Sequence, residues 1–268
     1  MAPDMIWFPA HHDAPLLKIP LLVLSTTLAI RAQTPKLKPT PDERSKYKQD
    51  IFSARWFIEL LALSYRVSFW QRSDCTVILT SRKVVYCTNT ICESAVILAA
   101  HRPGAPLTDR ILPLLVRGPM GKILNVRITR WWLAGCALMV CGASLRLWCY
   151  RALGRFFTYE LTVKKDHALV TSGPYAIVRH PAYAGSLLIG IGALMLHLSP
   201  GSWYRECVGW DTVWSKMLVG LWGIEVLGVP LGLTRRVNTE DEVLRREFGQ
   251  TWDAYAKRTP YRLLPFVY

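Results

Sequence analysis

The chain has 268 residues, of which 51% are apolar, with eleven Trp and a formal net charge of +14. The apolar residues come in blocks, which indicates a membrane protein and argues against a soluble core. Lys and Arg cluster beside these blocks and not along one basic face, so we expect positive loops at membrane boundaries and no nucleic-acid partner. The seven Cys residues include no CxxC pair and predict neither a disulfide framework nor a metal site.

Residues 1–130 predict an N-terminal membrane region with two spans. The first span lies near 15–31, close to the short limit for crossing the hydrocarbon core, and acidic residues before it argue against a cleaved signal peptide. Residues 34–48 are Pro-rich and basic, which predicts a cytosolic loop. One further span is expected within 51–101, where both 51–70 and 84–100 are apolar yet carry charged residues. The sequence does not decide between these two segments.

Residues 131–268 predict three more spans, at 131–150, 182–198 and 212–234. Small residues such as Gly135 in the first of these would let a neighbouring helix approach closely. The loop 151–181 and the tail after 234 are both basic and are separated by two spans, so both should face the cytosol and the N-terminus the lumen. The fold class is therefore an all-α integral membrane protein with about five transmembrane helices.

The tail predicts an amphipathic cytosolic helix over 239–257. Thr239 and Glu242 have the spacing of a capping box, which indicates that this helix begins at Thr239. Apolar residues then recur at helical spacing, and Glu240 and Asp241 suit the positive end of the helix dipole.

The stretch 169–185 is a polar turn between apolar segments. Gly173 and Pro174 indicate a tight turn, and Pro181 fits the first turn of a helix, which places His180 at the helix mouth. Backbone N–H groups at such a mouth can bind an anion or an acceptor-rich ligand. An alternative is purely structural: Arg179 snorkels at a membrane surface, and the Tyr residues of the stretch belong to an interfacial belt.

Taken together, the two stretches resemble the isoprenylcysteine carboxyl methyltransferase family of integral membrane enzymes, from about residue 145 onward. The matching positions are Leu145-Arg146, Leu153-Gly154, residues 167–170, Gly173-Pro174-Tyr175, residues 179–183, Gly185, Arg236, Glu240, Leu244, Phe248-Gly249, Tyr255 and residues 260–265. The resemblance implies S-adenosylmethionine as cofactor, in a cytosolic pocket formed by the inter-helix loop and the amphipathic C-terminal helix. In agreement, no Gly-x-Gly-x-x-Gly follows a strand-like segment.

The resemblance also implies roles for individual residues. Arg236 and Glu240 would be catalytic, with Arg236 holding the substrate carboxylate. Glu160 stands where related enzymes often carry Gln, and residues 199–211 form a longer loop that could alter substrate access. The implied cofactor contacts are Glu160, His167, Ala168, Leu169, Val170, Tyr175, His180, Pro181, Ala182, Tyr183 and Glu240.

The expected activity is methylation of the C-terminal carboxylate of isoprenylated cysteine at the endoplasmic reticulum membrane, with the site facing the cytosol. Prenylated protein C-termini and membrane lipids would be the partners. Because a carboxylate is already ionised at neutral pH, positioning and desolvation suffice and no general base is needed. Two alternatives stay open: a related methyltransferase acting on a small terpenoid or polyketide acid or a phospholipid amine, and a non-catalytic lipid-binding membrane protein.

Overall fold

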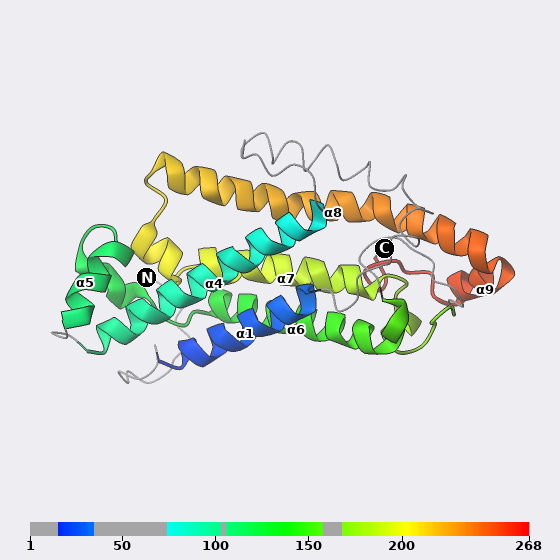
Figure 1. Cartoon of the computed structure of the whole chain (residues 1–268), viewed down its shortest axis with the longest axis horizontal. Coiled ribbons are helices and arrows are strands. Elements are labelled where there is room, and N and C mark those ends of the chain that lie inside the picture. Colours follow the sequence, from blue (N-terminus) through cyan, green and yellow to red (C-terminus); the bar gives the residue numbers. More distant parts are fainter. Residues whose placement is uncertain (1–15, 35–73, 103–105, 158–167, 268) are drawn as a thin grey trace. The chain divides into compact units, whose positions relative to one another are not determined.

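A computed structural model describes residues 16–34, 74–102, 106–157 and 168–267, and all regular structure within these ranges is helical (Figure 1). The predicted all-α class is thereby confirmed. The loop 35–48, the segment 51–70, Glu160 and His167 lie outside the described residues. The α-helices are α1 (Lys18–Gln33), α4 (Asp74–Ala100), α5 (Pro106–Leu115), α6 (Arg130–Leu153), α7 (Pro181–Leu198), α8 (Val213–Phe248) and α9 (Gln250–Arg258).

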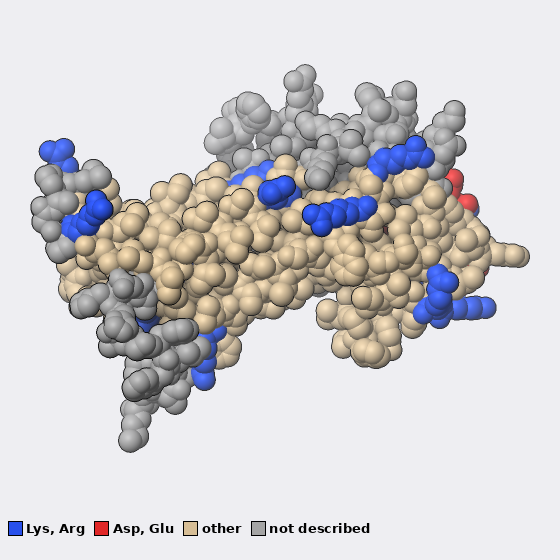
Figure 2. Space-filling view, turned by 90° about the horizontal axis from the view of Figure 1, so that it is seen from below, with Lys and Arg blue, Asp and Glu red and all other residues tan. Residues whose placement is uncertain are grey.

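Two of the described helices are long and apolar enough to cross a membrane: Arg130–Phe156 and Pro181–Leu198. They correspond to the spans predicted at 131–150 and 182–198. Helix α1 has 16 residues, and in the first described part of α8 the segment Val213–Ile224 is apolar. On the face shown in Figure 2, most of the described surface is neither basic nor acidic, and the charged residues that it shows are mostly Lys and Arg. The remaining three spans stay predictions.

The chain divides into two units, and the first comprises residues 1–31, 81–142 and 188–226. Within it α6 and α7 touch through glycines. A Cβ on Gly192 would lie 2.7 Å from both the carbonyl oxygen of Gly135 and the backbone nitrogen of Met139. A Cβ on Gly135 would lie 2.5 Å from the backbone nitrogen of Leu196. The close approach predicted for Gly135 is confirmed, and only glycine permits it at both positions.

A buried ion pair in the same unit explains why the apolar segment 84–100 contains a charged residue, Glu93. Lys18 of α1 pairs with Glu93 of α4, and both side chains are almost fully buried. The Lys18 ammonium also donates to the carbonyl oxygen of Gly201 at 2.6 Å and lies 4.8 Å from the centre of the Trp132 ring. A buried charge is tolerated only when it is paired and hydrogen-bonded, so these contacts allow Glu93 to be buried between packed helices.

The second unit comprises residues 32–80, 143–187 and 227–268. In it the structure corrects the predicted start of the C-terminal helix. Helix α8 continues without interruption to Phe248, so Thr239 lies inside a helix and does not begin one. No Gly or Pro separates Thr234 from Thr239, so helical hydrogen bonding simply continues through the capping-box pattern. The break falls at Gly249, whose φ of 53° favours glycine, and α9 follows it.

Candidate functional site

The loop before α7 is anchored by a buried tyrosine. Gly173, with a φ of 62°, opens a short 3-10 helix at Gly173–Ala176, as its turn signal predicts. The Tyr175 side chain packs in an apolar cluster with Cys149 and Ala182. Its carbonyl oxygen accepts a 2.8 Å hydrogen bond from the Tyr255 hydroxyl. Burial raises the pKa of Tyr175, and it raises the pKa of Tyr255 to about 12, so both phenols stay neutral at physiological pH.

The tail lies alongside the residues that precede α7. The backbone N–H of Arg179 donates to the carbonyl oxygen of Tyr261 at 3.0 Å, and that of His180 donates to Arg262 at 2.8 Å. The first helical turn is closed in part by the N–H of Tyr183 donating to the carbonyl oxygen of His180 at 3.1 Å. His180 does lie at the helix mouth, as predicted. Its own N–H is engaged by the tail, however, so anion binding there cannot rest on that group.

Tyr183 of α7 joins two residues of α8 in a hydrogen-bonded chain. The Arg236 Nε donates to the Tyr183 hydroxyl at 2.6 Å, and the hydroxyl donates to Glu240 Oε2 at 2.6 Å. Arg236 and Glu240 are four residues apart on one helix and therefore share a face. The His180 ring stacks on Tyr183, with ring centres 5.6 Å apart and planes inclined by 5°. The structure thus brings together four residues predicted from two distant stretches.

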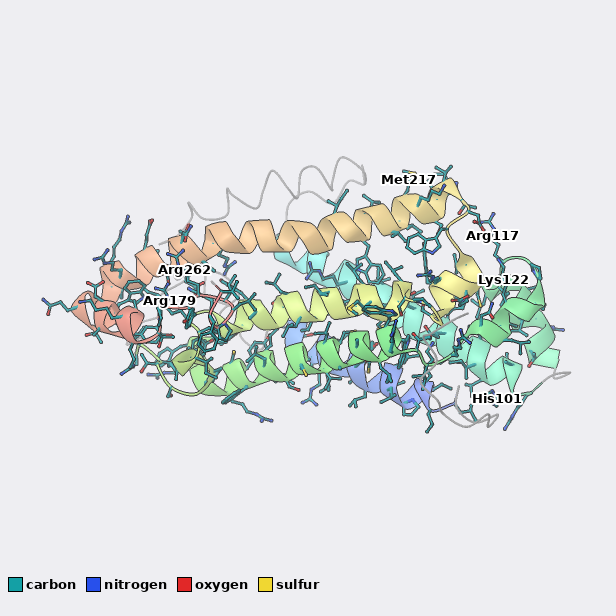
Figure 3. All side chains as sticks on the ribbon, turned by 180° about the vertical axis from the view of Figure 1, so that it is seen from behind. His101, Arg117, Lys122, Arg179, Met217 and Arg262 are labelled. Carbon is teal, nitrogen blue, oxygen red and sulfur yellow. The ribbon has the colours of Figure 1, made fainter. Side chains whose placement is uncertain are left out.

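Asp241 is a site residue that the sequence analysis assigned only to the helix dipole. Its buried carboxylate lies 2.9 Å from His180 Nε2 through Oδ1. Its Oδ2 lies 3.4 Å from one guanidinium nitrogen each of Arg179 and Arg262. Figure 3 shows Arg179 and Arg262 side by side next to α9. The signal available in the sequence was charge complementarity: an acidic pair in the tail and a basic Arg179-His180 pair in the loop.

Arg146 of α6 donates a hydrogen bond to the first turn of α7. It falls within the span predicted at 131–150, and the structure places it inside α6 with its side chain buried. Its Nη1 donates to the carbonyl oxygen of Ala182 at 2.9 Å, and its Nε donates to that of Ala32 at 2.8 Å. The bond from this charged donor to Ala182 holds the backbone at the first turn of α7 in place. A residue matched to the family through its motif therefore has a structural role next to the site.

The other predicted cofactor contacts are placed as follows. Ala168 is exposed, Leu169 and Val170 are half-buried, and Val170 packs against the cluster around Tyr175. Pro181 is buried and begins α7, as predicted. Whether these residues contact a cofactor stays a prediction. The predicted loop 199–211 belongs to the first unit, where Trp203 Nε1 donates to the carbonyl oxygen of Leu115 at 2.8 Å.

Within the described residues the regular structure is helical and two helices are candidates for crossing a membrane, with Arg, Tyr, His and carboxylate groups gathered at the start of one of them. The family model of the isoprenylcysteine carboxyl methyltransferase (ICMT) family matches residues 134–219. That match confirms the resemblance and covers His180 and Tyr183, but it ends before Arg236 and Glu240.

Individual proteins show the same similarity. Protein-S-isoprenylcysteine O-methyltransferase B of Arabidopsis thaliana is 29% identical over 141 residues, which are 51% of this chain and 61% of that protein. Protein-S-isoprenylcysteine O-methyltransferase of Schizosaccharomyces pombe is 26% identical over 52% of this chain and 51% of its own length. A Delta(14)-sterol reductase of Mus musculus is 29% identical over 37% of this chain and 20% of its own length. The matched parts thus span between a fifth and three fifths of these three proteins.

Proposed function

We propose that this protein methylates the C-terminal carboxylate of isoprenylated cysteine in prenylated proteins, with S-adenosylmethionine as methyl donor. The observation that carries the proposal is the chain of hydrogen bonds from Arg236 through Tyr183 to Glu240, because a guanidinium, which suits a carboxylate, lies beside an acidic and an aromatic side chain. The names of several similar proteins, all protein-S-isoprenylcysteine O-methyltransferases, support it.

The described residues fit the proposed cofactor. S-adenosylmethionine carries a sulfonium and an ammonium group, which favour carboxylates and aromatic faces. The Glu240 side chain is 27% exposed, and it lies beside Tyr183 and His180, which stack on each other. Asp241 Oδ2 is buried and faces the guanidinium groups of Arg179 and Arg262, so the partly exposed Glu240 is the carboxylate of this cluster that suits the cofactor. We propose that Glu240, Tyr183 and His180 hold the cofactor, together with residues 168–170.

Methyl transfer from a sulfonium to a carboxylate is an in-line displacement that forms one C–O bond and breaks one C–S bond. When bound, S-adenosylmethionine supplies the activated methyl group, and the products are a methyl ester and S-adenosylhomocysteine. Arg236 holds the carboxylate, since a guanidinium matches the two oxygens of that group. Tyr183 orients Arg236 by accepting from its Nε, and Glu240 orients Tyr183 in turn. Positioning of this kind supplies most of what the reaction needs.

Membrane placement is part of the proposal. Five spans would put the loop 151–181 and the tail on the cytosolic side of the endoplasmic reticulum membrane, where prenylated proteins are accessible. Helix α7 begins at Pro181 and is apolar enough to cross, so the cluster around His180 would lie at the membrane boundary. A prenyl chain would then reach the site from the lipid side while its carboxylate stays near water.

An assay on membranes that contain the full chain tests the proposal. Labelled S-adenosylmethionine would be offered with a farnesylcysteine analogue, a free terpenoid acid or phosphatidylethanolamine. We expect label in the farnesylcysteine analogue, released by base as expected for a methyl ester. Label only in the terpenoid acid or only in the phospholipid would replace the proposed substrate with one of the alternatives. The absence of label in all three would favour a non-catalytic lipid-binding protein.

A further inference from the structure

A strained turn follows the segment that pairs with the start of α7. The N–H of Val267 donates to the carbonyl oxygen of Leu264 at 3.3 Å, which closes a four-residue turn with Pro265 in its second position. Phe266 occupies the third position with a φ of 64°. Proline followed by a positive φ defines a type II turn, in which glycine or asparagine normally occupies that position. A phenylalanine at this position costs conformational energy. We therefore expect its side chain to make a favourable contact that offsets this cost.

The turn presents apolar side chains outward. Phe266 is 86% exposed and Val267 is 77% exposed, while Leu263 just before the turn is buried. The centre of the Phe266 ring lies 5.2 Å from that of the Tyr261 ring. Exposed apolar groups on a fixed turn are typical of surfaces that meet lipid or another molecule.

Backbone hydrogen bonds hold the segment before this turn against the start of α7. Tyr261 and Arg262 accept hydrogen bonds from Arg179 and His180, the two residues directly before Pro181. Pro181 begins α7, which is long and apolar enough to cross a membrane, and a spanning helix begins where hydrocarbon meets the headgroups. Phe266 is four residues from Arg262 and so lies within about 14 Å of it. The turn is therefore held within reach of the lipid headgroups.

The charges nearby favour one kind of partner. Lys257 and Arg258 are exposed in the last turn of α9, immediately before the tail segment. Basic side chains beside apolar and aromatic ones match an anionic membrane surface, to which each Lys or Arg is attracted. The basic pair lies a few residues before Tyr261 and Arg262, which pair with the residues preceding α7, and this combination favours a lipid surface over a protein partner.

We propose that residues 264–267 form a lipid-contact turn, which inserts Phe266 and Val267 among the headgroups of an anionic leaflet, with Lys257 and Arg258 binding the lipid charges. The turn then ties the tail, and through Arg262 the site, to the bilayer surface. This contact is independent of the proposed methyl transfer, since it needs only that α7 crosses the membrane.

Photo-crosslinking of the full chain in lipid nanodiscs tests the proposal. Benzoylphenylalanine replaces Phe266, a matched aromatic substitution at an exposed position, and in a second variant it replaces Val267. The control position is Gln250, an exposed polar residue at the other end of α9. The discs contain phosphatidylcholine alone, or phosphatidylcholine with phosphatidylserine as the minor component. Adducts are identified by mass spectrometry, which separates lipid from protein partners.

We expect lipid adducts from positions 266 and 267 that exceed those from 250 severalfold. Phosphatidylserine should be enriched among the adducts, and the double variant Lys257→Gln, Arg258→Gln should remove that enrichment. Adducts with a second copy of the chain, or lipid adducts no more abundant than at 250, would overturn the proposal. An unchanged lipid preference in the double variant would overturn the role of the basic pair. Because no methyl transfer is measured, failure here leaves the proposed activity to its own test.

Discussion

Oδ1 of Asp241 lies 2.9 Å from Nε2 of His180, and both side chains are buried. The same carboxylate faces Arg179 and Arg262 through its other oxygen, at 3.4 Å from each. One acidic group on α8 thus meets a histidine and an arginine from the loop and a second arginine from the tail. Asp241 therefore links the loop and the tail to α8.

Asp241→Asn should weaken this junction. Asparagine keeps an acceptor for His180 but removes the charge that Arg179 and Arg262 face, and loss of a buried charged partner costs about 1–3 kcal/mol. We expect a lower Tm in detergent and weaker binding of S-adenosylmethionine. The matched control is Asp253→Asn, because Asp253 pairs with Arg245 at 2.9 Å on an exposed surface, where such pairs contribute about 1 kcal/mol or less. Equal effects of the two changes would contradict a central role for Asp241.

Arg236→Lys separates a substrate clamp from a membrane anchor. Lysine would snorkel as well as arginine, but it lacks the planar fork and the Nε that donates to Tyr183. We expect normal insertion and cofactor binding with a loss of about 100-fold in methyl-transfer rate, the cost of a misplaced reacting group. Arg235→Lys serves as the control and should stay close to wild type. If both variants turn over normally, Arg236 does not hold the carboxylate.

Tyr255 should make the protein sensitive to alkaline pH. Its pKa is raised to about 12 by burial, while an unfolded chain has a tyrosine pKa of about 10. The folded state therefore favours the neutral phenol, so this contribution to stability is complete below about pH 10 and is lost as the pH rises to about 12. The loss amounts to about 2–3 kcal/mol.

Thermal unfolding across this pH range checks the prediction. Tyr255→Phe removes the hydrogen bond to Tyr175, which costs about 1 kcal/mol at neutral pH. Above about pH 10, however, its Tm should fall less steeply than that of the wild type. Parallel curves for the two proteins would show that Tyr255 is not the titrating group.

Gly192→Ala should push α6 and α7 apart. The new Cβ would meet backbone atoms of Gly135 and Met139 at 2.7 Å, which cannot be relieved by a side-chain rotation. Overpacking of this kind costs about 1–3 kcal/mol. Gly220→Ala is the control, because nothing lies within 4 Å of its Cβ position and alanine favours a helix by about 1 kcal/mol. A Tm that falls for Gly192→Ala and holds or rises for Gly220→Ala is the expected result.

Topology can be tested with glycosylation sites introduced at residues 40 and 115. Five spans with a lumenal N-terminus put residue 40 in the cytosol and residue 115 in the lumen. Only the second site should then be modified in microsomes. Modification at residue 40, or none at 115, would require a different number of spans before α6.

Features set by local sequence were predictable. Pro181 at the first position of α7 and the apolar runs of α6 and α7 depend only on neighbouring residues, and the structure has them where they were expected. The helix start expected at Thr239 was wrong. A capping-box pattern begins a helix only where the preceding residues are not helical, and here α8 already includes them. The capping-box pattern alone does not show whether the residues before it are helical.

Features set by distant contacts were not predictable. Glu93 obscured the segment 84–100 because its partner, Lys18, lies on another helix. Asp241 was assigned to a helix dipole because its contacts with His180 and Arg179 exist only once α8 lies against the loop. The charge and hydrophobicity of one stretch do not show which other stretch supplies the partner of a buried charged residue.

The pairing of Arg179 and His180 with Tyr261 and Arg262 also orders events during biosynthesis. Some 81 residues separate the loop from the tail, so at about 5–20 residues per second the loop waits roughly 4–16 s for its partner to be translated. Helices α7 and α8 are synthesised in that interval. Translation that stops before Tyr261 would therefore leave the backbone N–H groups of Arg179 and His180 without their acceptors in the tail, and Asp241 without Arg262.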